Sequence, residues 1–434
     1  MCKIWYFILE GLNSFGTVYY SYYLFFFMEQ VFGFGNQANL ALAALSGGIY
    51  MVASWWGGRF AQRFGYFRAL KVGFVIMMAA QAAGTQLGSV GGQVAVMAGT
   101  VIGMCFTWPT LEALVSEGEG PAGLQRMVGI YNVVWAGAGA LAYFTGGAMM
   151  ERLGLKSLFY VPLVILAGQL GLTIWIERLV IADCRLPIAN LDNRRRMISS
   201  AGSGNAGETP GPAAGTAAPL PAPVGFRLEA NPRPVAKAKT FLRLAWLANP
   251  LAYMTVNTLI AVMPSLAKRL ELSTMLAGFC GSVWCFARLG TFFGLWFWTG
   301  WHYRFGWLLA SYLALVSTFA AILLVPSLAV LVVAQMVFGL ALGLIYYSSL
   351  FYSMDVGETK GEHGGIHEAA IGLGNLVGPA VGAAALRFVP QHPESGTVAV
   401  SALLLVGLGG LVTIWRKGEG VRNPKSEIRN PKEI

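Results

Sequence analysis

The sequence is poor in charged residues: Asp, Glu, Lys and Arg make up 12% of its 434 residues. A soluble globular domain carries about 25%, and a soluble protein with this shortfall would have too little polar surface to face water. The composition therefore excludes an ordinary soluble protein. Hydrophobic residues make up 56% of the chain and glycine occupies 55 positions, as in membrane helices whose small residues let backbones approach.

Cysteine is scarce as well, with five residues and no pair at the spacing of a metal site. The sequence has no HExxH motif and no nucleotide-binding loop, and its one histidine-rich stretch, EHGGIHEA at 362–369, offers only two histidines separated by glycines. We therefore expect no metal, no cofactor and no catalytic residue. The net charge of +10 does not indicate nucleic acid, because the charges lie in loops between apolar runs.

Twelve runs are long and apolar enough for a membrane-crossing helix, which needs about 20 residues. They lie near 4–31, 38–60, 67–87, 92–115, 126–149 and 155–178, and near 241–267, 274–300, 305–325, 328–353, 364–388 and 397–416. The stretch at 182–238 is rich in Gly, Pro, Ala and Ser and is predicted to be a flexible linker. We predict an all-α membrane protein with two six-helix halves, 1–181 and 239–416, and a tail at 417–434.

Basic residues are distributed unevenly over the two sides of this layout. Arg288 lies inside a predicted helix, and one side holds only Arg152, Lys156, Lys268, Arg269 and Arg387; the rest of the 30 Lys and Arg lie on the other side. Because cytoplasmic loops carry the excess of Lys and Arg, we expect a multi-pass inner-membrane protein. Both termini and the linker are then cytoplasmic, which requires an even number of spans.

The two halves are similar at a constant offset. Without a gap, Gly58 aligns with Gly294, Arg68 with Arg304 and Gly103 with Gly339. Internal repeats of this kind occur in secondary transporters, whose substrate sites lie at the interface between the repeats.

A loop rich in Gly and Arg joins the second and third predicted helices. It reads GRFAQRFGYFR and places Gly58, Arg63, Gly65 and Arg68 at fixed spacing. This resembles the signature loop of the major facilitator superfamily, Gly-x-x-x-Asp-Arg-x-Gly-x-Arg-Arg, with Gln62 at the acidic position. The glycine at 58 permits close helix contact, and the arginines can anchor at the level of lipid phosphates.

The predicted helix at 364–388 carries a second glycine pattern that includes Gly374, Gly378 and Pro379. It resembles the antiporter motif of the same superfamily, which normally lies in the fifth helix rather than the eleventh. Glycines with a proline allow tight packing and bending. The resemblance covers the whole chain at the level of architecture. It implies alternating access and a central site lined by the first, fourth, seventh and tenth spans, and it names no substrate.

Polar side chains inside the predicted spans are candidate substrate-binding residues. A charge at the bilayer centre costs about 2.5–3.5 kcal/mol, so the mid-helix Arg288 needs an offsetting interaction. It could bind a substrate carboxylate or phosphate or pair with a titrating acid; the plainer alternatives are a structural ion pair or a side chain that snorkels to the helix end. Other candidates share helix faces through three- or four-residue spacing. They are Asn13, Thr17 and Tyr20, then Asn132 and Trp135, and finally Tyr253 and Asn257.

Four further residues are candidates for proton coupling or gating: Glu10, Glu112, His367 and Glu368. A carboxyl that faces a cavity can exchange a proton, and histidine titrates near neutral pH. Each of these residues also has a plainer interpretation, as a snorkelling side chain or as part of a solvated helix start.

We therefore predict a secondary active transporter, not an enzyme, that moves a small solute by alternating access. We expect it to act as a monomer in the lipid bilayer, with H+ as a candidate coupling ion. One alternative is a polytopic membrane enzyme, which would need clustered His, Asp or Ser. The other is a transporter-like sensor without flux. The sequence leaves the substrate, the direction and the choice among symport, antiport and uniport open.

Overall fold

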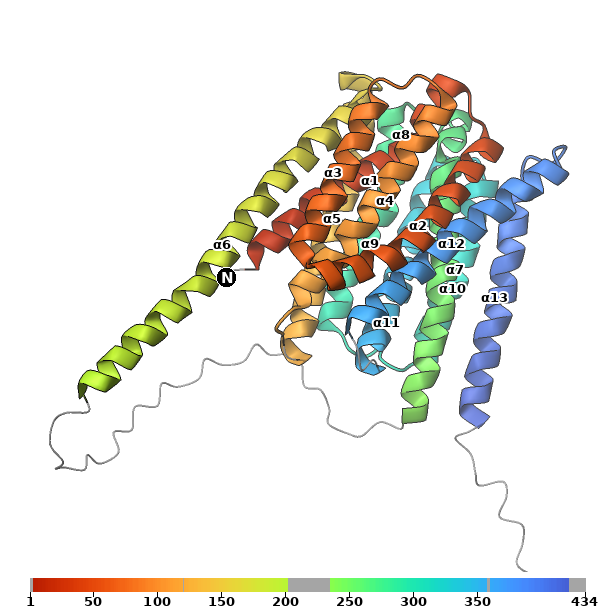
Figure 1. The fold of residues 1–434 in the computed structure, drawn as a ribbon. Helices are drawn as coiled ribbons and strands as arrows, with labels where there is room; N and C mark the ends of the chain where they lie inside the picture. The colour runs from red at the N-terminus through yellow and green to blue at the C-terminus, as the bar shows by residue number, and fades with distance from the viewer. Residues whose placement is uncertain (1–2, 120, 202–234, 357–359, 421–434) are drawn as a thin grey trace, which may run out of the picture.

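The computed structural model describes residues 3–119, 121–201, 235–356 and 360–420. These residues form an all-helical bundle without strands in the described part (Figure 1). The helices are α1 (Ile4–Phe32), α2 (Asn36–Phe64), α3 (Tyr66–Gly84), α4 (Val90–Ser116), α5 (Pro121–Leu153), α6 (Ser157–Ala201), α7 (Val235–Arg269), α8 (Thr274–Gly281), α9 (Val283–Phe297), α10 (Phe305–Leu324), α11 (Leu328–Val356), α12 (Lys360–Phe388) and α13 (Ser395–Gly420).

Eleven helical segments of the described residues are long and apolar enough to cross a membrane, and one of them, Thr274–Phe297, comprises α8 and α9. The interruption is local: at Ser282 the hydroxyl donates to the Phe279 carbonyl at 2.7 Å. The remaining long helix, α1, has 29 residues and contains Glu10, Asn13 and a run of tyrosines. It is long enough to be the twelfth span of the predicted architecture, and about half of its residues are buried by protein.

Two helices extend beyond the predicted spans. The sixth, α6, continues to Ala201, and α7 begins at Val235, so both reach into the stretch predicted to be a linker. Residues 202–234 and 421–434, which hold the rest of the predicted linker and most of the predicted tail, lie outside the described residues.

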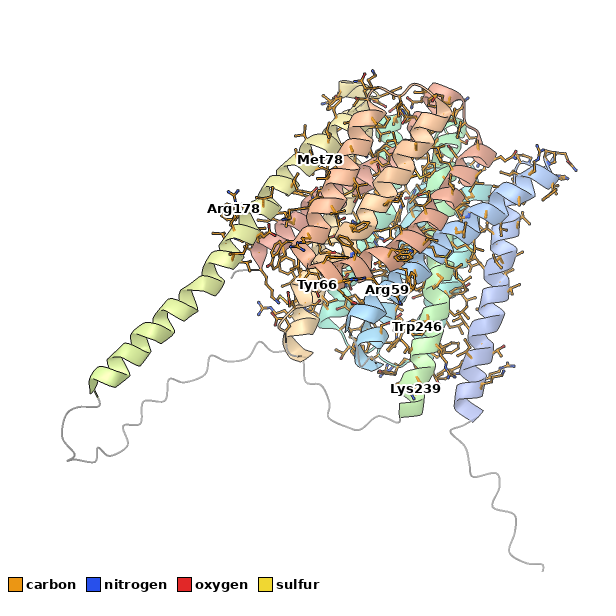
Figure 2. All side chains as sticks on the ribbon, in the orientation of Figure 1. Arg59, Tyr66, Met78, Arg178, Lys239 and Trp246 are labelled. Carbon is orange, nitrogen blue, oxygen red and sulfur yellow. The ribbon has the colours of Figure 1, made fainter. Side chains whose placement is uncertain are left out.

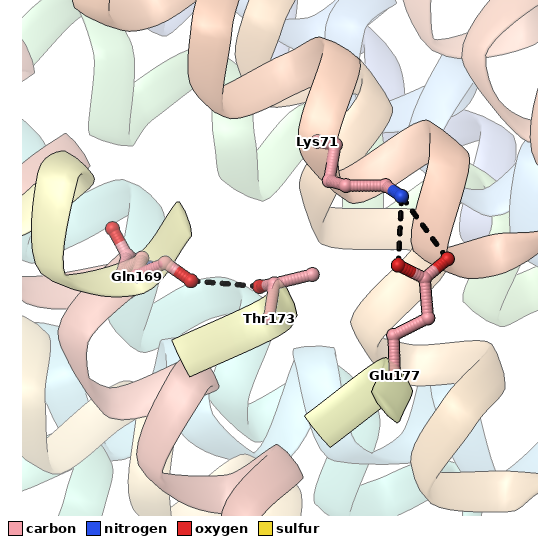
Figure 3. A network of polar contacts seen from close by, with 4 residues as sticks. All are labelled: Lys71, Gln169, Thr173 and Glu177. Carbon is pink, nitrogen blue, oxygen red and sulfur yellow. Dashed lines mark hydrogen bonds and ion pairs between the residues drawn. The ribbon is translucent and has the colours of Figure 1, made fainter. Parts of the chain in front are cut away.

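Polar contacts fix helices within the N-terminal half. In Figure 3, the Lys71 ammonium on α3 reaches both carboxylate oxygens of Glu177 on α6, at 3.0 and 2.8 Å. One turn before Glu177, the Thr173 hydroxyl donates to the carbonyl of Gln169 at 2.7 Å. At the start of α1, Lys3 pairs with Glu119 at 2.6 Å beyond the end of α4. The first turn of α1 therefore lies beside the last turn of α4.

Aromatic packing plays the corresponding role in the C-terminal half. The second-half counterpart of the signature loop ends near Trp301 and Tyr303, both buried. The backbone N–H of Tyr303 donates to the Tyr352 hydroxyl at 3.0 Å, and Phe241 of α7 contacts both tyrosine rings. Further along α7, the Trp246 indole donates to Ser353 of α11 at 3.2 Å, and Figure 2 shows Trp246 beyond Lys239 on that helix.

The two halves meet along two helix pairs, α2 with α12 and α5 with α8 and α9. Glycine makes both contacts close. A Cβ at Gly47 of α2 would overlap the backbone of Asn375, and a Cβ at Gly147 of α5 would overlap the carbonyl of Thr274. Backbones can approach this closely only where no side chain intervenes.

The ends of the helices lie on two sides of the bundle. We call the side where α1 begins and α4 ends the terminal side, and the opposite one the far side. On the far side the Gln30 amide donates to the Thr274 hydroxyl at 3.0 Å, and the Met275 backbone N–H donates to Glu151 at 2.7 Å. Both bonds join an N-terminal helix to α8, so the halves are held together on the far side.

The glycines of the two sequence motifs lie in different environments. In the signature loop, Gly57 rather than Gly58 makes the close contact, against the Cys105 carbonyl of α4; no described residue lies within 4 Å of a Cβ at Gly58. The expectation of close helix contact at 58 is therefore not met in this structure. The next glycine, Gly65, has a φ of 95° and turns the chain from α2 into α3.

Two motif glycines of α12 pack on α7, ahead of Pro379, which is inside the helix. A Cβ at Gly374 would overlap the Pro250 carbonyl, and one at Gly378 would overlap Met254. The tight packing expected of this pattern is therefore present.

Replacing Gly374 by alanine is expected to destabilise the protein by about 1–3 kcal/mol, because the added methyl overpacks the contact with α7. The matched control is Gly306→Ala in α10, where no described atom lies within 4 Å of the added carbon. Thermal unfolding in detergent should show a lower Tm for the first variant only. Equal melting of both variants would contradict the close α7–α12 contact.

Candidate functional site

A cavity with several polar groups in a largely apolar and aromatic lining lies between the two halves. Its volume is about 180 Å³, whereas a single water needs about 10–15 Å³ on the same measure. Eight spans line it, represented by Thr17, Tyr50, Glu112, Trp135, Tyr253, Arg288, Tyr346 and Glu368. These include the four helices that the family resemblance implied, α1, α4, α7 and α11. The cavity has room for a small solute.

The side chain of Arg288 enters this cavity from α9 and is 6% exposed. Its guanidinium carbon lies 4.4 Å from the ring centroid of Trp135 and 4.8 Å from that of Trp284. Neither ion pair in the described part of the chain includes Arg288. Two indole faces thus stabilise the cation through cation–π attraction, worth roughly 2 kcal/mol when desolvated. The structural ion pair considered from the sequence is therefore absent among the described residues.

One of these indoles is fixed by its own helix. The Trp135 indole N–H donates to the Asn132 side-chain oxygen at 2.9 Å, across one turn of α5. The amide of Asn132 is buried and does not line the cavity. Its contact is with Trp135, so it positions the ring that lies under Arg288.

Two carboxyls also line the cavity, Glu112 from α4 and Glu368 from α12. The Tyr50 hydroxyl of α2 donates to Glu368 at 2.5 Å. A third carboxyl, Glu10, is fully buried, accepts from Ser14 at 2.7 Å, and is faced by the cavity-lining Tyr131. No Lys, Arg or His within the described ranges forms an ion pair with any of the three.

Several predicted site residues do reach the cavity. Besides the arginine and the two carboxyls, they are Thr17, Trp135, Tyr253 and Asn257. The Asn257 amide donates to the Asn375 carbonyl at 3.1 Å, which ties α7 to α12 beside the cavity. Both residues of the α7 pair therefore line the cavity, whereas only Trp135 of the α5 pair does, because Asn132 is buried outside the lining.

Other predicted residues lie outside the lining of the central cavity. Asn13 and Tyr20 face α3, α4 and α6 inside the N-terminal half, although they share a helix face with Thr17 as predicted. The α1 helix is oriented so that Thr17 lines both the central cavity and a smaller inner cavity, whereas Asn13 and Tyr20 line only the inner cavity. His367 is 5% exposed and lies beside the Tyr346 ring, behind the cavity wall.

The inner cavity has a volume of about 10 Å³, and its lining includes both apolar residues and the polar residues Asn13, Tyr20 and Gln81. The side chains of Asn13 and Tyr20 and the amide oxygen of Gln81 are buried there without a hydrogen-bond partner. Donors and acceptors converge on a space the size of one water, so a single water suits this site. A solute does not.

Sequence reasoning missed several aromatic residues of the central cavity. They include Tyr50, Tyr131, Trp284 and Tyr346. Helical spacing holds a signal for one of them, because Trp284 precedes Arg288 by four residues and therefore lies on the same face. The others come from three different spans, and only tertiary packing brings them together.

Comparisons with known proteins bear on the fold. No protein-family model matches the sequence, and no curated protein matches it. Among solved structures, a mutant of the peptide transporter POT superposes with a TM-score of 0.65 at 14% identity, covering 96% of this chain and 94% of that one. A proton-dependent oligopeptide transporter gives a TM-score of 0.61 at 16% identity, covering 95% of this chain and all of that chain.

This chain has the major facilitator fold. In each superposition the similarity extends over nearly the whole length of this chain and of the compared structure, so it includes both six-helix halves. The fold class predicted from the helix count, the repeat and the signature loop is thus confirmed. In the major facilitator fold described here, α2 with α12 and α5 with α8 and α9 form the seams beside the central cavity.

A cysteine introduced at Asn257 should react with a small water-soluble methanethiosulfonate, because this side chain lines the central cavity. Asn132→Cys is the matched control, since that asparagine is buried and does not line it. Both variants are made after serine replaces the five native cysteines, and labelling is followed by mass spectrometry. Equal labelling at the two positions would contradict the cavity wall described above.

Proposed function

We propose that this protein is a secondary active transporter that carries a small solute through the central cavity by alternating access, with proton coupling. The observation that carries the proposal is the position and chemistry of the cavity. It lies between two pseudo-repeat halves and contains a buried arginine and two carboxyls without counter-ions. Binding sites at such repeat interfaces are the arrangement that alternating access needs.

The lining favours a solute with an anionic group and a flat or apolar body. Arg288 can donate two parallel hydrogen bonds to a carboxylate or phosphate, while the indoles of Trp135 and Trp284 supply apolar faces. The carboxyls of Glu112 and Glu368 would accept from an amine. Both similar structures are described as peptide transporters, and a short peptide carries both groups, so peptides come first among the solutes to test.

Proton coupling follows from the carboxyls. Glu112 and Glu368 face the cavity and Glu10 lies behind Tyr131, so each can exchange a proton by way of the same space. A carboxyl without a cationic partner changes the local charge when it gains or loses that proton. The solute and the proton would then bind in one electrostatic environment, which couples their occupancies.

The structure represents a conformation in which the two halves are joined on the far side. The Gln30 amide donates a hydrogen bond to the start of α8, Glu151 accepts one from it, and these bonds hold the halves together there. Rocking of the two halves about the central seam would break these bonds and open the far side. In the proposed orientation the terminal side is cytoplasmic, in an inner membrane, and one chain holds a complete cavity and acts as a monomer.

A thermal-shift screen at pH 6 and pH 8, with a panel of peptides, amino acids, organic acids and phosphorylated metabolites, tests binding. We expect a hit with an anionic group whose stabilisation differs between the two pH values. Uptake or efflux of that hit in proteoliposomes then tests transport. Tight binding without flux would contradict transport and favour a sensor.

Arg288→Gln is expected to weaken binding of the hit at least about tenfold, because a charge-assisted bond worth roughly 1.5–3 kcal/mol is lost. The control is Arg304→Gln, at an exposed position before α10 outside the cavity. Titration calorimetry or the thermal shift itself measures the difference. If both variants bind like the unmodified protein, Arg288 does not contact the solute.

A further inference from the structure

The hydrogen bond between Tyr50 and Glu368 joins the two halves of the molecule. Its donor belongs to α2 in the N-terminal half and its acceptor to α12 in the C-terminal half, 318 positions apart in sequence. Tyr50 is 7% and Glu368 6% exposed, and both line the cavity. A solute or a proton that reaches the cavity can therefore reach this bond directly.

Backbone contacts surround the bond. Along α2, Gly47 meets the backbone of Asn375, and Met51 meets Gly372. The Tyr50–Glu368 pair lies on the same two helices. On α12, Glu368 precedes the contact residues Gly372 and Asn375 and is closer to the start of the helix. At these glycines the backbones of α2 and α12 are in contact, with no side chain between them. Any relative motion of the two halves must therefore move α2 against α12 along this whole contact.

From this geometry we infer that Tyr50 and Glu368 form a proton-operated latch between the halves. A phenol that donates to an ionised carboxylate makes a charge-assisted bond, roughly twice as strong as a neutral one. When Glu368 takes up a proton, the bond becomes neutral and weakens. Deprotonation thus stabilises the conformation with the closed far side, and protonation releases α2 from α12.

This inference rests on the proposed function, because a latch between the halves serves transport. Its test does not depend on transport, because it measures conformation without any solute. It assigns Tyr50, a residue without charge, as the positioning residue through which the protonation state of Glu368 is transmitted to the other half. A difference of about 1 kcal/mol between charged and neutral hydrogen bonds corresponds to a population ratio that changes about fivefold with protonation.

Other titratable groups face Glu368, and they decide the design of the experiment. They are Glu10 on α1, Cys105 and Glu112 on α4, Tyr131 on α5, Tyr253 on α7, Tyr346 on α11, and the adjacent His367. Tyrosine and cysteine ordinarily ionise only above about pH 8. Measurements between pH 5.5 and 7.5 therefore leave Glu10, Glu112 and His367 as the competing groups.

The experiment measures the conformation of the full chain in lipid nanodiscs, without any solute. Spin labels are placed at Gln37 and Arg387, exposed positions at the far-side ends of α2 and α12, after replacement of the native cysteines. Double electron–electron resonance gives the ratio of short to long distances. We expect this ratio to rise about fivefold from pH 5.5 to pH 7.5.

Tyr50→Phe removes the donor hydroxyl alone and should reduce the pH effect to less than twofold. Tyr312→Phe is the matched control, because its buried hydroxyl donates to the Leu404 carbonyl within the C-terminal half, and it should keep the fivefold change. Glu368→Gln should hold the ratio near its pH 5.5 value. Glu112→Gln should retain the dependence on Tyr50.

The inference is overturned if the unmodified protein shows no pH dependence, or if Tyr50→Phe keeps the full change. In the second case Glu10, Glu112 or His367 carries the effect. Failure of transport in liposomes together with a Tyr50-dependent change in distance would leave the latch intact and reject the proposed transport. The two failures are therefore distinguishable.

Discussion

A buried positive charge without a carboxylate partner shapes the centre of this protein. Arg288 lies on α9 between the indoles of Trp135 and Trp284, and its charge must be accommodated without an ion pair in the described structure. Two aromatic faces and a polar cavity provide that accommodation. The Arg288 guanidinium therefore remains available to bind an incoming anion. A carboxylate of the protein paired with Arg288 would have occupied the hydrogen-bond donors that such an anion needs.

The rest of the bundle keeps that cavity between two bodies that can move. Glycines bring α2 onto α12 and α5 onto α8 through backbone contact, while bulky aromatics fill the centre. Within each half, the Lys71–Glu177 pair, the Lys3–Glu119 pair and the aromatic cluster around Phe241 tie helices together. These contacts within each half, together with a close glycine-lined seam between the halves, favour movement of the halves as units, as alternating access requires.

The architecture could be predicted from the sequence because hydrophobic length, basic loops and the internal repeat are local or periodic signals. Glycines 374 and 378 were likewise recognisable from their spacing. The details of the site depend on how each helix is rotated, and spacing does not determine this. Asn13, Thr17 and Tyr20 do share a face, yet that face is turned toward α3, α4 and α6 with only Thr17 reaching the centre. The phenol of Tyr50 carries no charge, so nothing in the sequence marked it as the partner of Glu368.

The central claim is that movement of the solute and movement of protons are coupled through one cavity. The most direct measurement records the internal pH of proteoliposomes with a trapped dye while the solute identified by binding is added outside. The account predicts a pH change that depends on the solute, disappears with Arg288→Gln, and is strongly reduced when Glu368 is replaced by Gln. Solute flux of normal rate without any accompanying proton movement would contradict the account.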